Sequence, residues 1–128
     1  MNQYNNTHIK KQNIGDYFIY PEFKGTLNNS DVEVEKELKE EKIKLKLMVK
    51  LSNDKIIDIK YQCTTCVTLV AYCEKLCALL KGKEIVFARN IRLKDIINFF
   101  TEVPSYKHNK ALLVYAALQD LIKYKMEV

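Results

Sequence analysis

An alternation of apolar and polar residues between positions 43 and 51 is the clearest pattern in the chain. The apolar positions are Ile43, Leu45, Leu47, Val49 and Leu51, and the positions between them are Lys44, Lys46, Met48 and Lys50. Successive side chains of a β-strand point to opposite faces, so this run predicts a strand with one buried face and one lysine-coated face.

Two shorter alternating runs flank this strand. Val32 and Val34 alternate with acidic residues before it, and Ile57, Ile59 and Tyr61 alternate with Asp58 and Lys60 after it. Residues 52–54, Ser-Asn-Asp, supply the turn between the second and third runs. Because the connections are short, we predict a three-stranded antiparallel meander with Ile57, Ile59 and Tyr61 on one face.

The apolar period becomes helical from about Thr65. The apolar residues that recur at spacings of three and four are Leu69, Val70, Cys73, Leu76, Cys77 and Leu80. Lys81-Gly82-Lys83 predicts the end of this helix, because glycine often follows the last helical turn. A shorter helix is predicted over residues 93–100. A long final helix is predicted from Lys110 to about Lys125, with an apolar stripe formed by Leu112, Tyr115, Leu118 and Ile122.

These elements predict an α+β fold in which helices pack on one face of a three-stranded antiparallel sheet. The length of 128 residues suits one domain. Residues 1–13 are polar and are predicted to form a mobile N-terminal tail. Residues 14–128 are predicted to form the single domain, which opens with a short amphipathic helix or turn over residues 14–23.

Charge and hydropathy exclude some classes of function. The chain has 21 basic and 16 acidic residues and a net charge of +5, but its lysines are spread out and only two basic residues are arginines. We therefore predict an acidic protein partner rather than a nucleic acid. No apolar run reaches 18 residues and the N-terminus lacks the apolar core of a secretion signal, so we predict no membrane span and a cytoplasmic location.

Cysteines are the main candidates for chemistry, and in the cytoplasm they are expected to be thiols or metal ligands. Cys66 falls at the first turn of the predicted helix, where free N–H groups and the positive dipole end stabilise a thiolate. Cys63 precedes it in a C-x-x-C spacing that can bring two sulfurs to one metal. The alternative is that both side chains only pack in the protein interior.

Three further residues leave alternatives open. Cys73 and Cys77 lie on the apolar stripe, which indicates core packing, with a redox pair or a second metal site as the alternative. His108 immediately precedes Asn109, a natural N-cap for the last helix. His108 is therefore either a surface or capping residue or a metal ligand.

Several of these residues, in this order and spacing, resemble the NifU/IscU-type scaffold family of iron–sulfur cluster assembly. Tyr17, Pro21 and the Gly-Thr-Leu of residues 25–27 match the N-terminal pattern of the family, and residues 56–61 resemble the strand before its Gly-Cys-Gly segment. Cys66 falls on the cysteine of that segment, and His108 falls on the histidine of the family's His-Cys pair. The resemblance covers roughly residues 14–125.

The same resemblance shows which ligands have changed. Family members hold a nascent cluster with three cysteines, helped by an aspartate and the histidine. The turn that carries the first cysteine is here residues 38–42, without cysteine, and the third cysteine is Asn109. Glu40, Glu41 and Asn109 are the candidates to replace the lost ligands, although oxygen ligands suit a soft cluster less well than thiolates.

The resemblance thus implies a scaffold-like protein, not an enzyme, that accepts sulfur at Cys66. It would bind a transient [2Fe–2S] cluster or zinc through Cys66, His108 and Cys63. The implied partners are a cysteine desulfurase, assembly chaperones and apo-protein clients. One alternative is a cluster-less adaptor or regulator that docks to a desulfurase or another assembly protein, and another is a thiol-redox role for Cys63 and Cys66.

Overall fold

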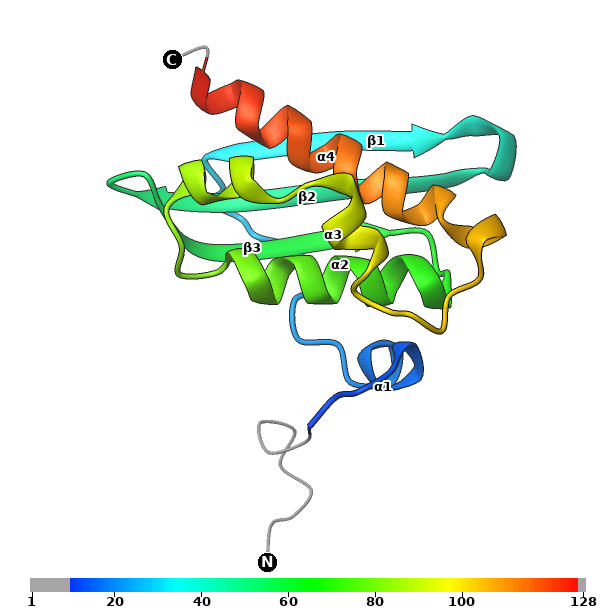
Figure 1. Ribbon diagram of the computed structural model, residues 1–128. Helices are drawn as coiled ribbons and strands as arrows, with labels where there is room; N and C mark the ends of the chain where they lie inside the picture. Colours follow the sequence, from blue (N-terminus) through cyan, green and yellow to red (C-terminus); the bar gives the residue numbers. More distant parts are fainter. Residues whose placement is uncertain (1–9, 127–128) are drawn as a thin grey trace, which may run out of the picture.

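The computed structural model describes residues 10–126 and shows a three-stranded sheet with α2 and α4 on one face (Figure 1). The strands are β1 (Val32–Leu38), β2 (Ile43–Ser52) and β3 (Lys55–Cys63). They pair antiparallel in the order β1-β2-β3, and the β2–β3 turn has positive φ angles of 52° at Asn53 and 65° at Asp54. The predicted α+β class and antiparallel meander are confirmed.

The helices largely follow the predicted ranges. They are α1 (Ile14–Ile19), α2 (Val67–Leu80), α3 (Leu93–Ile97) and α4 (Asn109–Met126), with 3₁₀ turns η2 (Lys39–Glu41), η3 (Ile85–Asn90) and η4 (Ser105–Lys107). α4 packs on β1 and β2, α2 packs on β3, and α1 packs against α2 (Figure 1). None of the helices in residues 10–126 has the length and hydrophobicity that a membrane span requires.

Helix α2 is the best-predicted helix. Every residue of its predicted apolar stripe is buried: Leu69, Val70, Cys73, Leu76, Cys77 and Leu80. Core packing of Cys73 and Cys77 is therefore confirmed. Gly82 has a φ of +86°, which favours glycine, and its N–H donates to the carbonyl of Ile56 at 2.8 Å, so the predicted stop also ties α2 to β3.

The predicted face of β3 is wrong at its start. Ile57 is 44% exposed, whereas Ile56 is fully buried. The pairing with β2 shifts at this point, because Lys50 pairs with Asp58 and the next residue, Leu51, pairs with Ile56. Ile57 is the extra residue of a β-bulge, so the alternation that begins correctly at Ile59 cannot be extended back through it.

The predicted stripe of α4 is also partly wrong. Leu112 is 51% exposed, and the buried positions are Ala111, Leu113, Val114, Ala117, Leu118 and Leu121. This helix contacts β1, β2, α2 and α3, so its buried arc is wider than a single stripe. The small residues Ala111 and Ala117 belong to that arc, and a period count based on large side chains overlooks them.

The second face of the sheet is charged and is crossed by the chain before β1. Residues 23–25 run parallel to β3, with the N–H of Tyr61 donating to Phe23 at 3.0 Å and the N–H of Gly25 donating to Tyr61 at 2.9 Å. The Gln62 amide then donates to the Thr26 hydroxyl at 2.7 Å. Met48, which alternates with buried residues on β2 and lies on this second face, is itself only 1% exposed.

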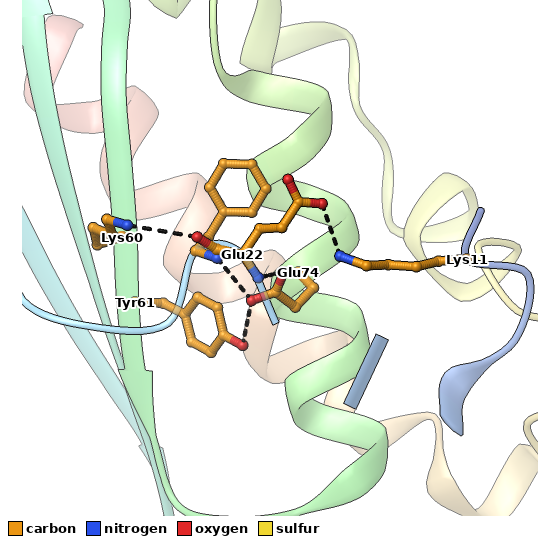
Figure 2. A network of polar contacts seen from close by, with 6 residues as sticks. Lys11, Glu22, Lys60, Tyr61 and Glu74 are labelled. Atoms are coloured by element: carbon orange, nitrogen blue, oxygen red, sulfur yellow. Dashed lines mark hydrogen bonds and ion pairs between the residues drawn. The ribbon is translucent and has the colours of Figure 1, made fainter. Parts of the chain in front are cut away.

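A buried carboxylate holds this N-terminal segment in place (Figure 2). Glu74 of α2 is 1% exposed and accepts hydrogen bonds from the N–H groups of Glu22 at 2.7 Å and Phe23 at 3.0 Å and from the Tyr61 hydroxyl at 2.8 Å. Burial is the main reason that the pKa of Tyr61 lies well above its ordinary value, so Tyr61 remains a hydrogen-bond donor. Three chain segments are thereby joined at one side chain.

The predicted tail is only partly within the described residues, because residues 1–9 lie outside them. In residues 10–13, Lys11 forms an ion pair with Glu22 at 2.7 Å. The Asn13 side chain caps α1 by accepting from the N–H of Asp16 at 3.0 Å.

Candidate functional site

Three chain segments meet at the end of the sheet where β1 turns into β2 (Figure 1). They are the η2 turn, the link from β3 to α2, and the start of α4. Thr64 in the link exchanges two hydrogen bonds with Lys44 of β2, at 3.1 and 3.0 Å. Glu41 in the η2 turn contacts the start of α4. The sequence positions predicted to carry ligands therefore come from segments that share one end of the molecule.

Cys66 is the N-cap residue of α2, one position before the first turn where the sequence placed it. Its backbone is extended, with φ −152° and ψ 119°, and its thiol makes no capping hydrogen bond to the helix. The residue is partly exposed. The N-terminus of a helix stabilises negative charge. Cys66 lies at this terminus, and its thiol makes no hydrogen bond to the backbone N–H groups there.

His108 lies between η4 and α4 and is partly buried. Its Nε2 is 3.2 Å from the carbonyl oxygen of Val103. Because a carbonyl oxygen only accepts, we assign the proton to Nε2, which leaves a lone pair on Nδ1 of the neutral ring. Metal-binding histidines commonly donate their second N–H in this way, so the ring is held in a form that can bind a metal.

Cys63 has a different neighbour from the one that the C-x-x-C spacing indicates. Its thiol forms a hydrogen bond with Cys73 of α2, which is buried. That hydrogen bond lowers the pKa of Cys63, and burial raises the pKa of Cys73. The neighbour of Cys63 is therefore a buried residue of α2.

The turn at residues 38–42 and the start of α4, which the resemblance assigns to the lost cysteines, are joined by an ion pair and a hydrogen bond. Glu41 accepts from the Asn109 amide and from Lys110 Nζ, the latter at 2.5 Å. The hydrogen bond from Lys110 is the main cause that lowers the pKa of Glu41 below its ordinary 4.5. Asn109 Oδ1 is buried without a hydrogen-bond partner. Glu40 is exposed in the same turn.

The candidate ligands are of types that bind metals, but they are not gathered around one point. A thiol and an imidazole are ligands that both iron and zinc accept. Within residues 10–126, however, no three Cys, His, Asp or Glu side chains form a group that could hold a metal ion. Among the candidates, the Cys66 thiol and Nδ1 of His108 have no competing contact in the described residues. Cys63 contacts Cys73, and Glu41 contacts Asn109 and Lys110.

Sequence reasoning missed two residues that shape this region. For Cys73 the sequence indicates core packing, with a redox pair or a second metal site as the alternative, but it does not indicate Cys63 as the neighbour. Glu74 was overlooked, although a charged residue four positions after buried Val70 lies on the same helix face and needs a partner. That signal is visible in the sequence once the buried face of α2 is known.

The structure is thus a small α+β domain in which the segments that carry Cys66 and His108 lie at one end of the sheet. The family model described as "NifU-like N terminal domain" matches residues 9–128. The chain belongs to this family, and the resemblance seen in the sequence is confirmed.

Solved structures share the fold at low sequence identity. One neighbour is a nitrogen-fixing NifU-like protein (N-terminal) from Brucella abortus, at 18% identity and a TM-score of 0.74, covering 89% of this chain and 92% of that one. Another is a proposed iron–sulfur cluster assembly scaffold protein for the SUF system from Fervidobacterium islandicum, at 21% identity and a TM-score of 0.66, covering 83% and 90%. A search of curated proteins finds no match to this chain.

Proposed function

We propose that this protein is a scaffold-type component of iron–sulfur cluster assembly whose sulfur acceptor is Cys66. The observation that carries the proposal is the position of Cys66: a partly exposed thiol without a capping bond at the N-terminus of α2, in a chain of the NifU-like family. The description of the F. islandicum neighbour as a proposed scaffold supports the same role.

The proposed reaction is a transfer of sulfane sulfur. A cysteine desulfurase presents a persulfide, and the Cys66 thiolate attacks its terminal sulfur. The sulfur–sulfur bond of the donor breaks, Cys66 becomes a persulfide, and the desulfurase cysteine leaves as a thiolate that takes up a proton. Cys66 acts here as a stoichiometric acceptor, so the proposal does not make the protein an enzyme. The free cysteines support a reducing, cytoplasmic setting.

Iron or zinc is the proposed metal cargo, either in a transient [2Fe–2S] cluster or as a single ion. Cys66 Sγ and His108 Nδ1 would bind it, and Cys63 would join them only after leaving Cys73. Glu40, Glu41 and Asn109 are the candidates for further ligands, and Glu41 would have to release Lys110. Assembly chaperones and apo-protein clients are the proposed downstream partners.

The test is reconstitution without oxygen, in which the purified chain is incubated with iron, cysteine and a desulfurase. We expect iron and acid-labile sulfide in equal amounts, with charge-transfer absorption bands that disappear in Cys66→Ser. Cys77→Ser is the matched control, because Cys77 lies on the same helix and is buried. Equal iron and sulfide in Cys66→Ser and in the unchanged chain would contradict the proposal.

A second function is favoured by the contacts of Glu41. These contacts occupy the positions of the first and third family cysteines with an ion pair and a hydrogen bond instead of thiolates. A protein with this arrangement would serve as a cluster-less adaptor that docks to the desulfurase. Binding of the metal-free chain to a desulfurase, unchanged in Cys66→Ser and without metal uptake, would favour this function over the first.

A further inference from the structure

Strand β1 lies at one edge of the sheet, and its outer side has no partner strand within residues 10–126 (Figure 1). The opposite edge, β3, is contacted by Lys24 and Glu84 through isolated bridges. Among the described residues, the backbone of β1 makes no hydrogen bond beyond its side toward β2. Every second residue of β1 therefore presents an N–H and a carbonyl that can pair with another strand.

The exposed side chains of this edge are acidic. Residues 31–41 hold six acidic residues and two lysines, in a chain whose net charge is +5. Glu33, Glu35 and Glu37 alternate along β1 and are all exposed. Lys46 Nζ lies 3.2 Å from the carboxylate of Glu33, whereas Glu35 and Glu37 have no ion pair or side-chain hydrogen bond in the part of the chain that the structure describes. The net charge indicates an acidic partner, but the local charge of this edge favours a basic one.

An open groove of about 250 Å³ lies beside the second half of β1. Three consecutive residues of the strand, Glu35, Lys36 and Glu37, line it together with Lys44 of β2. The Lys36 ammonium is engaged with α4, because its Nζ is 3.1 Å from the carboxylate of Asp120. The groove thus offers space for side chains next to the two carboxylates that have no partner.

The same acidic row disfavours a second copy of this chain as the occupant. Two copies related by a twofold axis would pair β1 with itself in antiparallel fashion, with equivalent faces on the same side. The central registers then place Glu35 opposite Glu35, or Glu33 opposite Glu37, and like charges directly opposite each other are destabilising. A strand with basic residues at alternate positions meets no such repulsion.

We propose that β1 binds an extended basic segment of a partner protein, which adds to the sheet as a fourth strand. Main-chain hydrogen bonds would supply binding, and lysines or arginines opposite Glu33, Glu35 and Glu37 would supply specificity. The proposal is independent of sulfur acceptance at Cys66. Because β1 leads directly into the η2 turn, the added strand would bring its protein to the end of the sheet where the candidate site lies.

The experiment measures binding of short peptides to the full chain by fluorescence anisotropy at low ionic strength. The probe is the capped, labelled peptide Thr-Lys-Thr-Lys-Val-Lys-Thr, whose lysines lie opposite the three glutamates when it aligns antiparallel to β1. The control, Lys-Lys-Lys-Thr-Thr-Val-Thr, has the same composition and charge without the alternation. We expect the probe to bind about tenfold more tightly than the control.

Two modified probes test strand pairing itself. One carries N-methyl groups at its odd positions and the other at its even positions. Alternate N–H groups of a strand point to the same side, so methylation should abolish binding in one of these probes and spare it in the other.

Charge reversal tests the position of the site. Glu35→Lys replaces an attraction by a repulsion and should weaken binding of the probe about tenfold. Glu84→Lys is the matched control, because it makes the same change of charge at an exposed residue beside the opposite edge of the sheet. It should change the affinity by less than about twofold. Both residues are exposed, and circular dichroism checks that the variants fold.

Four results would overturn the proposal. The probe does not bind, or it binds no better than the control peptide, or both methylated probes bind equally well, or Glu35→Lys leaves its affinity unchanged. A chain that ignores the probe but forms a dimer in sedimentation experiments, lost in Glu35→Lys, would identify a second copy as the occupant and would also overturn it.

Discussion

Glu74 and Cys66 lie on the same helix, about two turns apart, and their surroundings are opposite. Glu74 is buried and accepts hydrogen bonds from two backbone N–H groups and one hydroxyl (Figure 2). Cys66 is partly exposed, and its thiol makes no capping bond. The two residues therefore illustrate two roles for a polar group. Glu74 uses its carboxylate oxygens to hold the fold together, whereas the Cys66 thiol makes no capping hydrogen bond.

The largest expected effect comes from removing the buried carboxylate. Glu74→Ala leaves two backbone N–H groups and the Tyr61 hydroxyl without their acceptor, and each unsatisfied buried group costs about 1–3 kcal/mol. We expect the free energy of unfolding in urea to fall by about 3–5 kcal/mol. Tyr61→Phe is the graded control and should cost about 1 kcal/mol. A Glu74→Ala variant as stable as the unchanged chain would contradict the role of Glu74 in holding the N-terminal segment in place.

The same contrast between buried and open positions can be tested on adjacent residues of β3. Ile56→Ala should lower the free energy of unfolding by about 3 kcal/mol, because Ile56 is fully buried. Ile57→Ala, at the bulge, should change it by less than about 0.5 kcal/mol. Urea titration of both variants measures the difference, and the reverse order of effects would show that the β2–β3 register is wrong.

Replacing Cys66 should affect chemistry without affecting stability. Cys66→Ser removes only a partly exposed sulfur, so the midpoint of thermal unfolding should stay within about 2 °C of the original. Cys77→Ser places a hydroxyl in the core and should lower that midpoint by several times more. Equal losses in the two variants would mean that Cys66 is part of the core and not an available thiol.

The smallest expected effect concerns Glu41 and depends on pH. The pKa of Glu41 is lowered in the folded chain, chiefly by Lys110, so the carboxylate contributes stability above its ordinary pKa of 4.5. This contribution is lost as the pH falls below 4.5 through the folded value. Thermal unfolding of Glu41→Gln should therefore differ slightly from that of the unchanged chain at pH 7, and the difference should vanish in acid. A difference that grows as the pH falls would contradict this assignment.

The sequence predicts an element correctly where a single buried face sets its pattern of apolar residues. The alternation on β2 and the stripe of α2 are each set by a single buried face, so their periods predict them. Ile57 and Leu112 were misplaced because a bulge and a helix with several neighbours break a simple period. Cys66 and His108 are site residues proposed from order and spacing, and their roles stay predictions. The proximity of Cys63 and Cys73 involves two elements, and no spacing along one element encodes it.

The most direct test of the central claim is to locate the first persulfide on the protein. The chain is incubated without oxygen with a cysteine desulfurase and cysteine, the persulfides are trapped by alkylation, and the peptides are mapped by mass spectrometry. The account predicts a persulfide on Cys66 that persists in Cys63→Ser and is absent in Cys66→Ser. A desulfurase that carries its own persulfide yet leaves Cys66 unmodified, or modifies only Cys63, would contradict it.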